Sequence, residues 1–241
     1  MKNMLWILSI AVLMTSFFPP STEGRESIIL LKPGAAEGEL PEGWKPLTFK
    51  KVTRHTRYRI IEENGRPAIH AKSDRSASGL TYALDLDPKT YQTLSWCWKV
   101  DRIISKGDVR KKAGDDYAAR IYVTFKFDPG QSSFLERTKF GTYKLLFGKY
   151  PPKGALNYVW ANRLKKGASA PNAYTDRAHM VAIQSGTDKT GQWVCEERNL
   201  YEDYKKYFGG EPPRISGIAV MTDTDNTGET ATAAYADLVL K

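Results

Sequence analysis

Short apolar segments separated by turn-forming residues run along most of this chain, from Trp44 to its end. Apolar and polar residues alternate within several of these segments, which is the pattern of a strand with one buried face. Asn64-Gly65 separates two such segments and predicts a hairpin. The strands are predicted over residues 58–61, 68–71, 79–86, 94–100, 119–127, 158–162, 180–184, 193–197, 215–222 and 233–240.

Strand segments at this density, without regularly alternating helices, favour an all-β, mainly antiparallel sandwich or barrel over a parallel α/β sheet. The segment 119–127 also separates two faces. Ile121 and Val123 share one face and are expected in the core, whereas Arg120 and Tyr122 share the opposite face. That second face is expected to meet water or a ligand.

One short helix is predicted in the C-terminal half. Asn199 can cap its start, Glu202 three residues later completes a capping-box-like pair, and Gly209 can end it. Its apolar residues recur at helical spacing, so the helix is expected to cover one end of the sandwich. This stripe consists of Leu200, Tyr204, Tyr207 and Phe208.

The N-terminal segment has the features of a secretory signal peptide. Lys2 precedes an apolar run from Met4 to Phe18, which is shorter than the roughly 20 residues that span a bilayer. Cleavage is expected near Gly24, and an uncleaved anchor is the alternative. A periplasmic or secreted protein with no membrane span after signal removal is predicted. Its expected division is a signal peptide over residues 1–24, a lead-in segment over 25–43 and a β-sandwich domain over 44–241.

The charge of the chain adds a constraint on its partners. The net charge is +9 and stays +9 without residues 1–24, because that segment carries one Lys and one Glu. An exported protein rarely meets nucleic acid, so acidic glycans or anionic envelope surfaces are the natural opposite-charge partners. Cys97 and Cys195 fit an oxidising compartment. The sequence leaves open whether they form a disulfide or stay as two buried thiols.

An unusual polar segment over residues 221–229 follows an apolar strand and is rich in oxygen ligands suited to Ca²⁺. It is not an EF-hand, because the twelfth position counted from Asp223 is Ala234 instead of Glu. The alternatives are a turn whose side chains bind their own backbone, or direct contact with a ligand. The candidate calcium ligands are Asp223, Asp225, Asn226 and Asp237.

Trp160 and Asn162 share one strand face, and an aromatic ring beside an amide suits a sugar. The sequence therefore predicts a polar ligand, most plausibly a glycan, on one concave sheet face. The alternative for each Trp is a place in the core. The candidate ligand-binding residues are Trp98, Asp116, Arg120, Tyr122, Trp160, Asn162, Gln184 and Glu197.

A hydrolase or lyase acting on glycans is the second hypothesis. A glycoside hydrolase needs two carboxylates about 5–10 Å apart across the scissile bond. The histidines are scattered and no nucleophile motif is present, so carboxylates are the only candidate catalytic groups. These carboxylates are Asp116, Glu197, Asp223 and Asp225.

Several runs resemble an uncharacterised bacterial family, catalogued as domain of unknown function 3047. The most specific is the Met-Thr-Asp-Thr-Asp-Asn-Thr-Gly run from Met221, and the similarity covers most of the chain after Trp44. The resemblance implies an exported bacterial protein with a jelly-roll sandwich similar to carbohydrate-binding modules, and it assigns no residue a role. Further matching runs start at Ser76, Leu84, Trp96, Asp115 and Tyr158.

Overall fold

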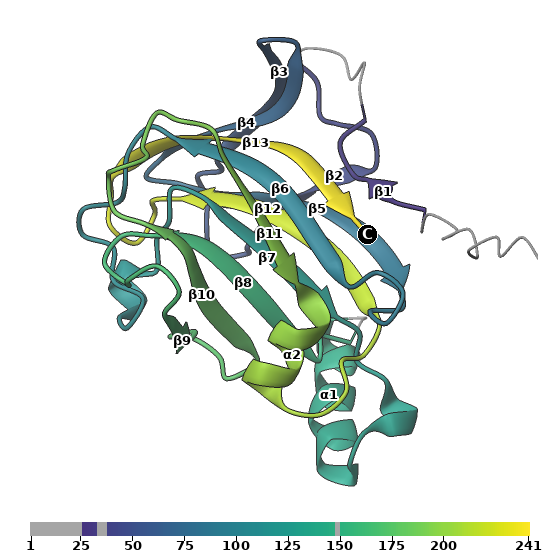
Figure 1. The fold of residues 1–241 in the computed structure, drawn as a ribbon. Helices are drawn as coiled ribbons and strands as arrows, with labels where there is room; N and C mark the ends of the chain where they lie inside the picture. The colour runs from purple at the N-terminus through teal and green to yellow at the C-terminus, as the bar shows by residue number, and fades with distance from the viewer. Residues whose placement is uncertain (1–25, 33–37, 148–149) are drawn as a thin grey trace, which may run out of the picture.

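The computed structural model describes residues 26–32, 38–147 and 150–241. The signal peptide expected over residues 1–24 lies outside this part of the chain. The described residues fold into two sheets packed face to face, a jelly-roll-like and mainly antiparallel β-sandwich (Figure 1). The predicted fold class is confirmed.

The six-stranded sheet has the order β11-β6-β13-β4-β3, and β1 pairs with the far end of β13. The last strand of the chain thus lies in the middle of this sheet. Its strands are β1 (Ile28–Ile29), β3 (Arg57–Glu63), β4 (Arg66–Asp74), β6 (Thr93–Val100), β11 (Val194–Asn199) and β13 (Thr230–Leu240).

The seven-stranded sheet has the order β2-β5-β12-β7-β8-β10-β9, and its β8–β10 pair is parallel. Two 3-10 helices lie in its connections, η1 (Lys112–Gly114) and η2 (Pro129–Gln131). The strands are β2 (Trp44–Leu47), β5 (Ala77–Leu86), β7 (Arg120–Phe125), β8 (Gly154–Ala161), β9 (Ser169–Pro171), β10 (Ala178–Ser185) and β12 (Ile215–Asp223).

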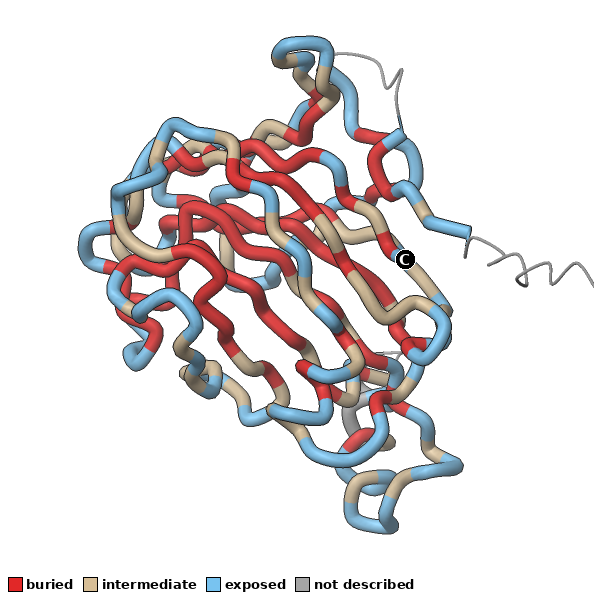
Figure 2. Tube along the Cα trace, viewed as in Figure 1, coloured by how far each residue is buried: buried red, intermediate tan, exposed pale blue. Residues whose placement is uncertain are grey.

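The main core lies between the two sheets, where Figure 2 shows long buried stretches. Ile121 and Val123 are fully buried there, as the alternation in β7 predicts. Trp98 and Trp160 are also enclosed, with exposed fractions of 0% and 1% and ring centroids 5.8 Å apart. Both rings therefore belong to the core, and neither forms the predicted ligand-facing surface. Alternation shows that two residues share a face, but it does not show which face is the core.

The hairpin at Asn64-Gly65 is confirmed. Glu63 of β3 pairs with Arg66 of β4, which leaves a two-residue loop. Asn64 and Gly65 have φ values of 56° and 73°. Positive φ at both central positions is the backbone of a type I′ turn, and Asn-Gly is the sequence that accepts it most readily.

Two α-helices accompany the sheets. Helix α2 (Leu200–Phe208) is the predicted one: the Asn199 side chain accepts a hydrogen bond from the Glu202 amide, and Gly209 ends the helix at φ 71°. Helix α1 (Phe134–Phe147) was not predicted from the sequence. Its apolar residues form no clear stripe, and Phe134 and Leu135 are exposed.

A disulfide links Cys97 of β6 to Cys195 of β11, two residues that are direct partners in the sheet register. The alternative of two free thiols is thereby excluded. Among the described residues no helix is long and apolar enough to cross a membrane.

Candidate functional site

Polar side chains collect on the outer face of the seven-stranded sheet. Tyr122 of β7 lies there between Ala219 of β12 and Asn157 of β8, its direct register partners. Thr124 follows on the same side, and its hydroxyl forms a hydrogen bond with that of Ser216. We call this set, Tyr122, Thr124, Asn157 and Ala219, the Tyr122 face. Tyr122 and Thr124 are half-buried, so water reaches part of it.

Connecting segments cover the neighbouring part of the same sheet face. The segment before β7 and the one after β8 fold over the outer sides of β8 and β10. They enclose a second, smaller apolar cluster that is separate from the main core. Its buried members are Val109, Tyr117, Val159, Ala161, Met180 and Ala182.

Arg120 lies next to Tyr122, under these segments. It is 3% exposed, so the face predicted to be wet is dry at this point. Its guanidinium donates to Asp223 and lies 3.4 Å from Asp115. The rings of Tyr117 and Tyr122 flank it, with centroids 5.2 Å and 5.5 Å from the guanidinium carbon. Arg120 is thus held by two carboxylates and two aromatic rings.

Negative charge exceeds positive charge around Arg120. Burial raises the pKa of Asp223 well above its usual value, and Asp116 and Asp115 raise it further, although Arg120 lowers it. Burial likewise raises the pKa of Asp115 against the opposing effect of Arg120. The pKa of Asp225 is also raised, by burial and then by Asp116. The cluster therefore resists full ionisation.

Carboxylate oxygens of Asp116, Asp223 and Asp225 lie within 4.8 Å of one another. The Asn226 side chain donates to Asp116 and Asp225, so three of the four predicted calcium ligands do come together. The oxygens of Asp116, however, already accept four hydrogen bonds, from the amides and side chains of Asn226 and Thr227. A carboxylate has about four lone-pair sites, so Asp116 has none left for a cation. With Asp223 paired to Arg120, this donor set does not fit Ca²⁺ in its present arrangement.

Asp237 does not belong to this cluster, and the prediction that it joins a calcium site is wrong. It lies on β13 seven residues beyond Thr230, which is roughly 20 Å of extended strand. There it forms an ion pair of 3.3 Å with Arg66. Asp237 is close to the loop in sequence, but its position along β13 places it at a distance from the cluster.

Three buried polar atoms around the Tyr122 face have no hydrogen-bond partner among the described residues. They are Oη of Tyr117, Nε of Arg120 and Oδ1 of Asn157. Buried polar atoms in native proteins are almost always paired with protein or ordered water. Three unpaired atoms in one patch indicate a place where water or a ligand group completes the hydrogen bonding. Burial also raises the pKa of Tyr122 to about 12, so its hydroxyl stays protonated.

The other predicted ligand residues lie elsewhere. Asn162 is buried, and it braces the covering segment by accepting from the Ile104 amide and donating to the Asp116 carbonyl, both at 2.8 Å. Gln184 is buried and donates to Glu196. Glu197 lies on β11 in the other sheet, exposed and 3.6 Å from Lys241. The predicted residues therefore do not form a single surface. Arg120, Tyr122 and Asp116 share one region, and Asn162 borders it through its hydrogen bond to the Asp116 carbonyl.

A family model described as "Protein of unknown function (DUF3047)" matches residues 42–239. The chain belongs to this family. No curated protein sequence matches it. The following solved structures are distantly similar to it. The family 11 carbohydrate-binding module of the cellulosomal cellulase Lic26A-Cel5E of Clostridium thermocellum is 9% identical, with a TM-score of 0.44, and the match covers 89% of this chain and 94% of that one.

The xyloglucanase domain of NopAA, a type three effector from Sinorhizobium fredii, is 8% identical with a TM-score of 0.44, and the match covers 90% of this chain and 98% of that one. A family 29 carbohydrate-binding module in complex with mannohexaose is 10% identical, with a TM-score of 0.36. The match covers 89% of this chain and 90% of that one.

Sequence reasoning did not select two residues that matter in this DUF3047 protein, Tyr117 and Asn157. Tyr117 precedes β7 and folds back over the sheet, so no strand alternation marks it. Asn157 did carry a signal: it is a polar residue inside β8, and it shares a face with Val159 and not with Trp160. Asn157 lies directly opposite Tyr122 in the β7–β8 register. Its Nδ2 donates to Met180 Sδ at 3.1 Å, whereas its Oδ1 has no partner among the described residues.

Proposed function

We propose that this DUF3047 protein is an exported binding module that holds a polar, hydroxyl-rich ligand, most simply a glycan, on its Tyr122 face. The observation that carries the proposal is the group of three unpartnered buried polar atoms beside Tyr122. A folded protein leaves such atoms unpaired at a cost of about 1–3 kcal/mol each. Ordered water or a ligand hydroxyl group can complete their hydrogen bonding.

The chemistry of these atoms suits hydroxyl groups. The Tyr117 hydroxyl can donate or accept, the Arg120 Nε–H donates, and the Asn157 carbonyl oxygen accepts. A sugar hydroxyl also donates and accepts, so it can match all of these atoms. The half-buried ring of Tyr122 adds an apolar surface beside Ala219, and such amphipathic rings suit the C–H side of a sugar.

Export is supported by two features of the chain. The Cys97–Cys195 disulfide is of the kind that forms in oxidising compartments. The first 24 residues carry the charge and apolar pattern of a secretory signal. Together they favour a periplasmic or secreted protein, where glycans are abundant.

Binding is favoured over hydrolysis by the state of the carboxylates. A glycoside hydrolase uses two carboxylates that face each other across the bond they cleave. Here Asp116 is saturated with hydrogen bonds, and Asp223 is paired with Arg120. Glu197 belongs to the other sheet. Asp225 is exposed close to Asp116 and Asp223, but neither of those two carboxylates is available as its catalytic partner.

The test is a thermal-shift screen of the purified protein against neutral and acidic oligosaccharides, followed by calorimetry on any hit. A ligand at 100 times its Kd should stabilise the protein by about 2.7 kcal/mol. Tyr122→Ala should weaken binding about tenfold or more. Tyr201→Ala, which removes a half-buried ring from α2, is the matched control and should leave binding unchanged. Absence of any shift with every oligosaccharide would overturn the proposal.

A further inference from the structure

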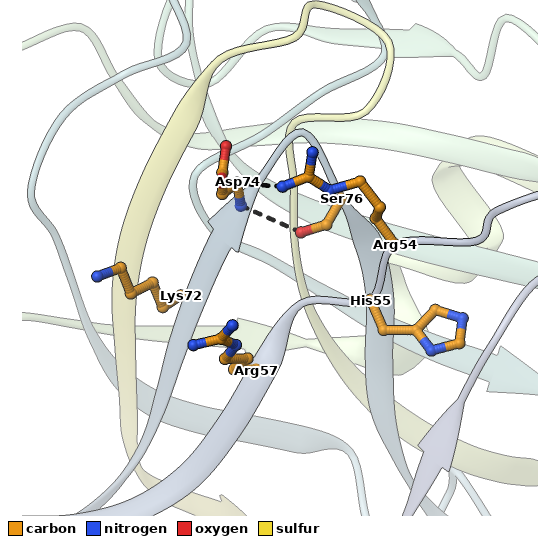
Figure 3. A pocket seen from close by; sticks show the side chains of 6 residues that line it. All are labelled: Arg54, His55, Arg57, Lys72, Asp74 and Ser76. Atoms are coloured by element: carbon orange, nitrogen blue, oxygen red, sulfur yellow. Dashed lines mark hydrogen bonds and ion pairs between the residues drawn. The ribbon is translucent and has the colours of Figure 1, made fainter.

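The outer face of the six-stranded sheet contains a separate pocket, on the opposite side of the sandwich from the Tyr122 face. It has a volume of about 380 Å³ and lies between the start of β3, the end of β4 and the segment before β3 (Figure 3). Positive side chains dominate its lining. The lining residues are Arg54, His55, Arg57, Lys72, Asp74 and Ser76.

Two of these positive groups lie side by side on neighbouring strands. Arg57 of β3 and Lys72 of β4 are direct register partners, and both are exposed. Like charges at directly opposed positions destabilise a strand pair. Within the described part of the chain no carboxylate forms an ion pair with either of them. Asp74, the acidic group in the lining, is already engaged by Arg54 at 2.9 Å and by Arg75 at 3.1 Å.

The wall of the pocket beside Asp74 is fixed by buried hydroxyl groups. Ser76 Oγ accepts from the Asp74 amide at 3.1 Å and lies 2.9 Å from Ser73 Oγ and 3.3 Å from Thr56 Oγ1. Ser78 Oγ donates to the Thr56 carbonyl at 3.2 Å. This network ties the segment before β3 to the end of β4. The positive groups therefore extend from a rigid base.

A histidine next to the pocket, His70, lies in a positively charged environment. His70 lies two residues before Lys72 on the same outer face, directly opposite Arg59. Burial lowers the pKa of His70, and the charges of Arg59, Lys72 and Lys99 lower it further, while Asp101 opposes them. Three cations and one carboxylate thus act on this imidazole. The positive charge extends from the pocket along β4.

We propose that this pocket is a binding site for a tetrahedral oxyanion, a sulfate or phosphate group, either free or carried on a polymer. Arg57 supplies a planar fork that can donate to two oxygens at once, and Lys72 supplies a point charge from the opposite strand. The bound anion converts the repulsion between the two side chains into two attractive contacts. The site is independent of the Tyr122 face and of any glycan bound there.

The test compares two double variants with the same change in net charge. Arg57→Gln with Lys72→Gln removes both cations of the pocket. Lys111→Gln with Lys165→Gln removes two exposed cations from loops outside it. Sulfate binding is measured by calorimetry at constant ionic strength with chloride as the compensating anion. We expect the first variant to lose affinity about tenfold or more and the second less than about twofold, because salt screens distant charges.

Equal losses in both variants, or none in either, would overturn the proposal. A second measurement uses the wild-type protein alone: nuclear magnetic resonance titration of the His70 ring, where saturating sulfate should raise the pKa of His70. An unchanged His70 pKa would also overturn it. Dextran sulfate and neutral dextran distinguish the two sources of the anion. Saturable binding of inorganic sulfate indicates a free anion, whereas binding of dextran sulfate alone indicates a polymer.

Discussion

Arginine has opposite surroundings on the two outer faces of the sandwich. On the seven-stranded sheet Arg120 is buried, flanked by two aromatic rings and held by carboxylates that outnumber it. On the six-stranded sheet Arg57 is exposed, faces another cation and has no acidic partner among the described residues. The net charge of +9 is therefore not spread evenly. The guanidinium of Arg120 is already paired with carboxylates inside the protein, whereas that of Arg57 is exposed to solvent.

The largest effect on the free energy of unfolding is expected when each arginine is replaced by an uncharged residue of similar length. Arg120→Met leaves Asp223 and Asp115 buried without their cation, so it should destabilise the protein by about 3–5 kcal/mol. Arg57→Met should change the free energy of unfolding by no more than about 0.5 kcal/mol. Denaturant unfolding monitored by tryptophan fluorescence measures both. Similar effects of the two substitutions would refute the comparison.

A smaller effect is expected at two buried tyrosines. The Tyr158 hydroxyl donates to Asp203 at 2.7 Å, whereas the Tyr117 hydroxyl has no partner among the described residues. Tyr158→Phe should therefore cost about 1–3 kcal/mol, because Asp203 loses a buried hydrogen bond. Tyr117→Phe should be neutral or stabilising without ligand and should weaken glycan binding. A large cost for Tyr117→Phe would mean that protein or tightly held water already satisfies that hydroxyl.

Asp225 gives a smaller effect with a defined pH dependence. Its folded-state pKa is raised above 3.8, so ionising it costs more in the folded than in the unfolded protein. Stability from this group is present below pH 3.8 and is lost as the pH rises through the folded-state value. Asp225→Asn should therefore raise the melting temperature at pH 7 and have no effect well below pH 3.8.

The same variant tests the calcium hypothesis. If the cluster rearranges to hold Ca²⁺, calcium should raise the melting temperature of the wild-type protein and chelator should reverse the rise. Asp225→Asn should reduce the response. Equal melting temperatures with calcium and with chelator would agree with the saturated state of Asp116.

The smallest expected effect concerns His70 on the basic face. Its folded-state pKa is lowered from 6.5, so the unfolded chain binds the proton more readily. The contribution of His70 to stability is complete above pH 6.5 and falls as the pH drops toward the folded-state value. His70→Gln should remove this part of the pH dependence in denaturant unfolding. An identical pH profile for the variant would show that neither burial nor the surrounding cations lower the pKa of His70.

The sequence predicts the strands well because alternation and turn residues are local signals, as the Asn64-Gly65 hairpin and the Asn199 cap illustrate. Helix α1 also has a local signal, a capping box in which the Ser133 amide donates to the Glu136 carboxylate and the Glu136 amide donates to Ser133 Oγ. Its exposed Phe134 and the lack of a clear apolar stripe concealed it.

The candidate site was harder to predict, because its contacts join distant parts of the chain. Asp116 meets Thr227 across 111 positions, and Arg120 meets Asp223 across 103. Strand alternation assigns Trp98 to a face but cannot tell the inner side of a sheet from the outer one. Nothing in a single sequence specifies which carboxylate an arginine will pair with.

The central place of β13 has a consequence for how the protein folds. β4 and β6 are its neighbours on either side, yet they are made more than a hundred residues earlier. Until residues 230–240 arrive, both strands present open edges that can pair with other chains. Such long-range pairing is slow. The nascent chain therefore has a period of exposure to aggregation that ends only when its last strand is inserted.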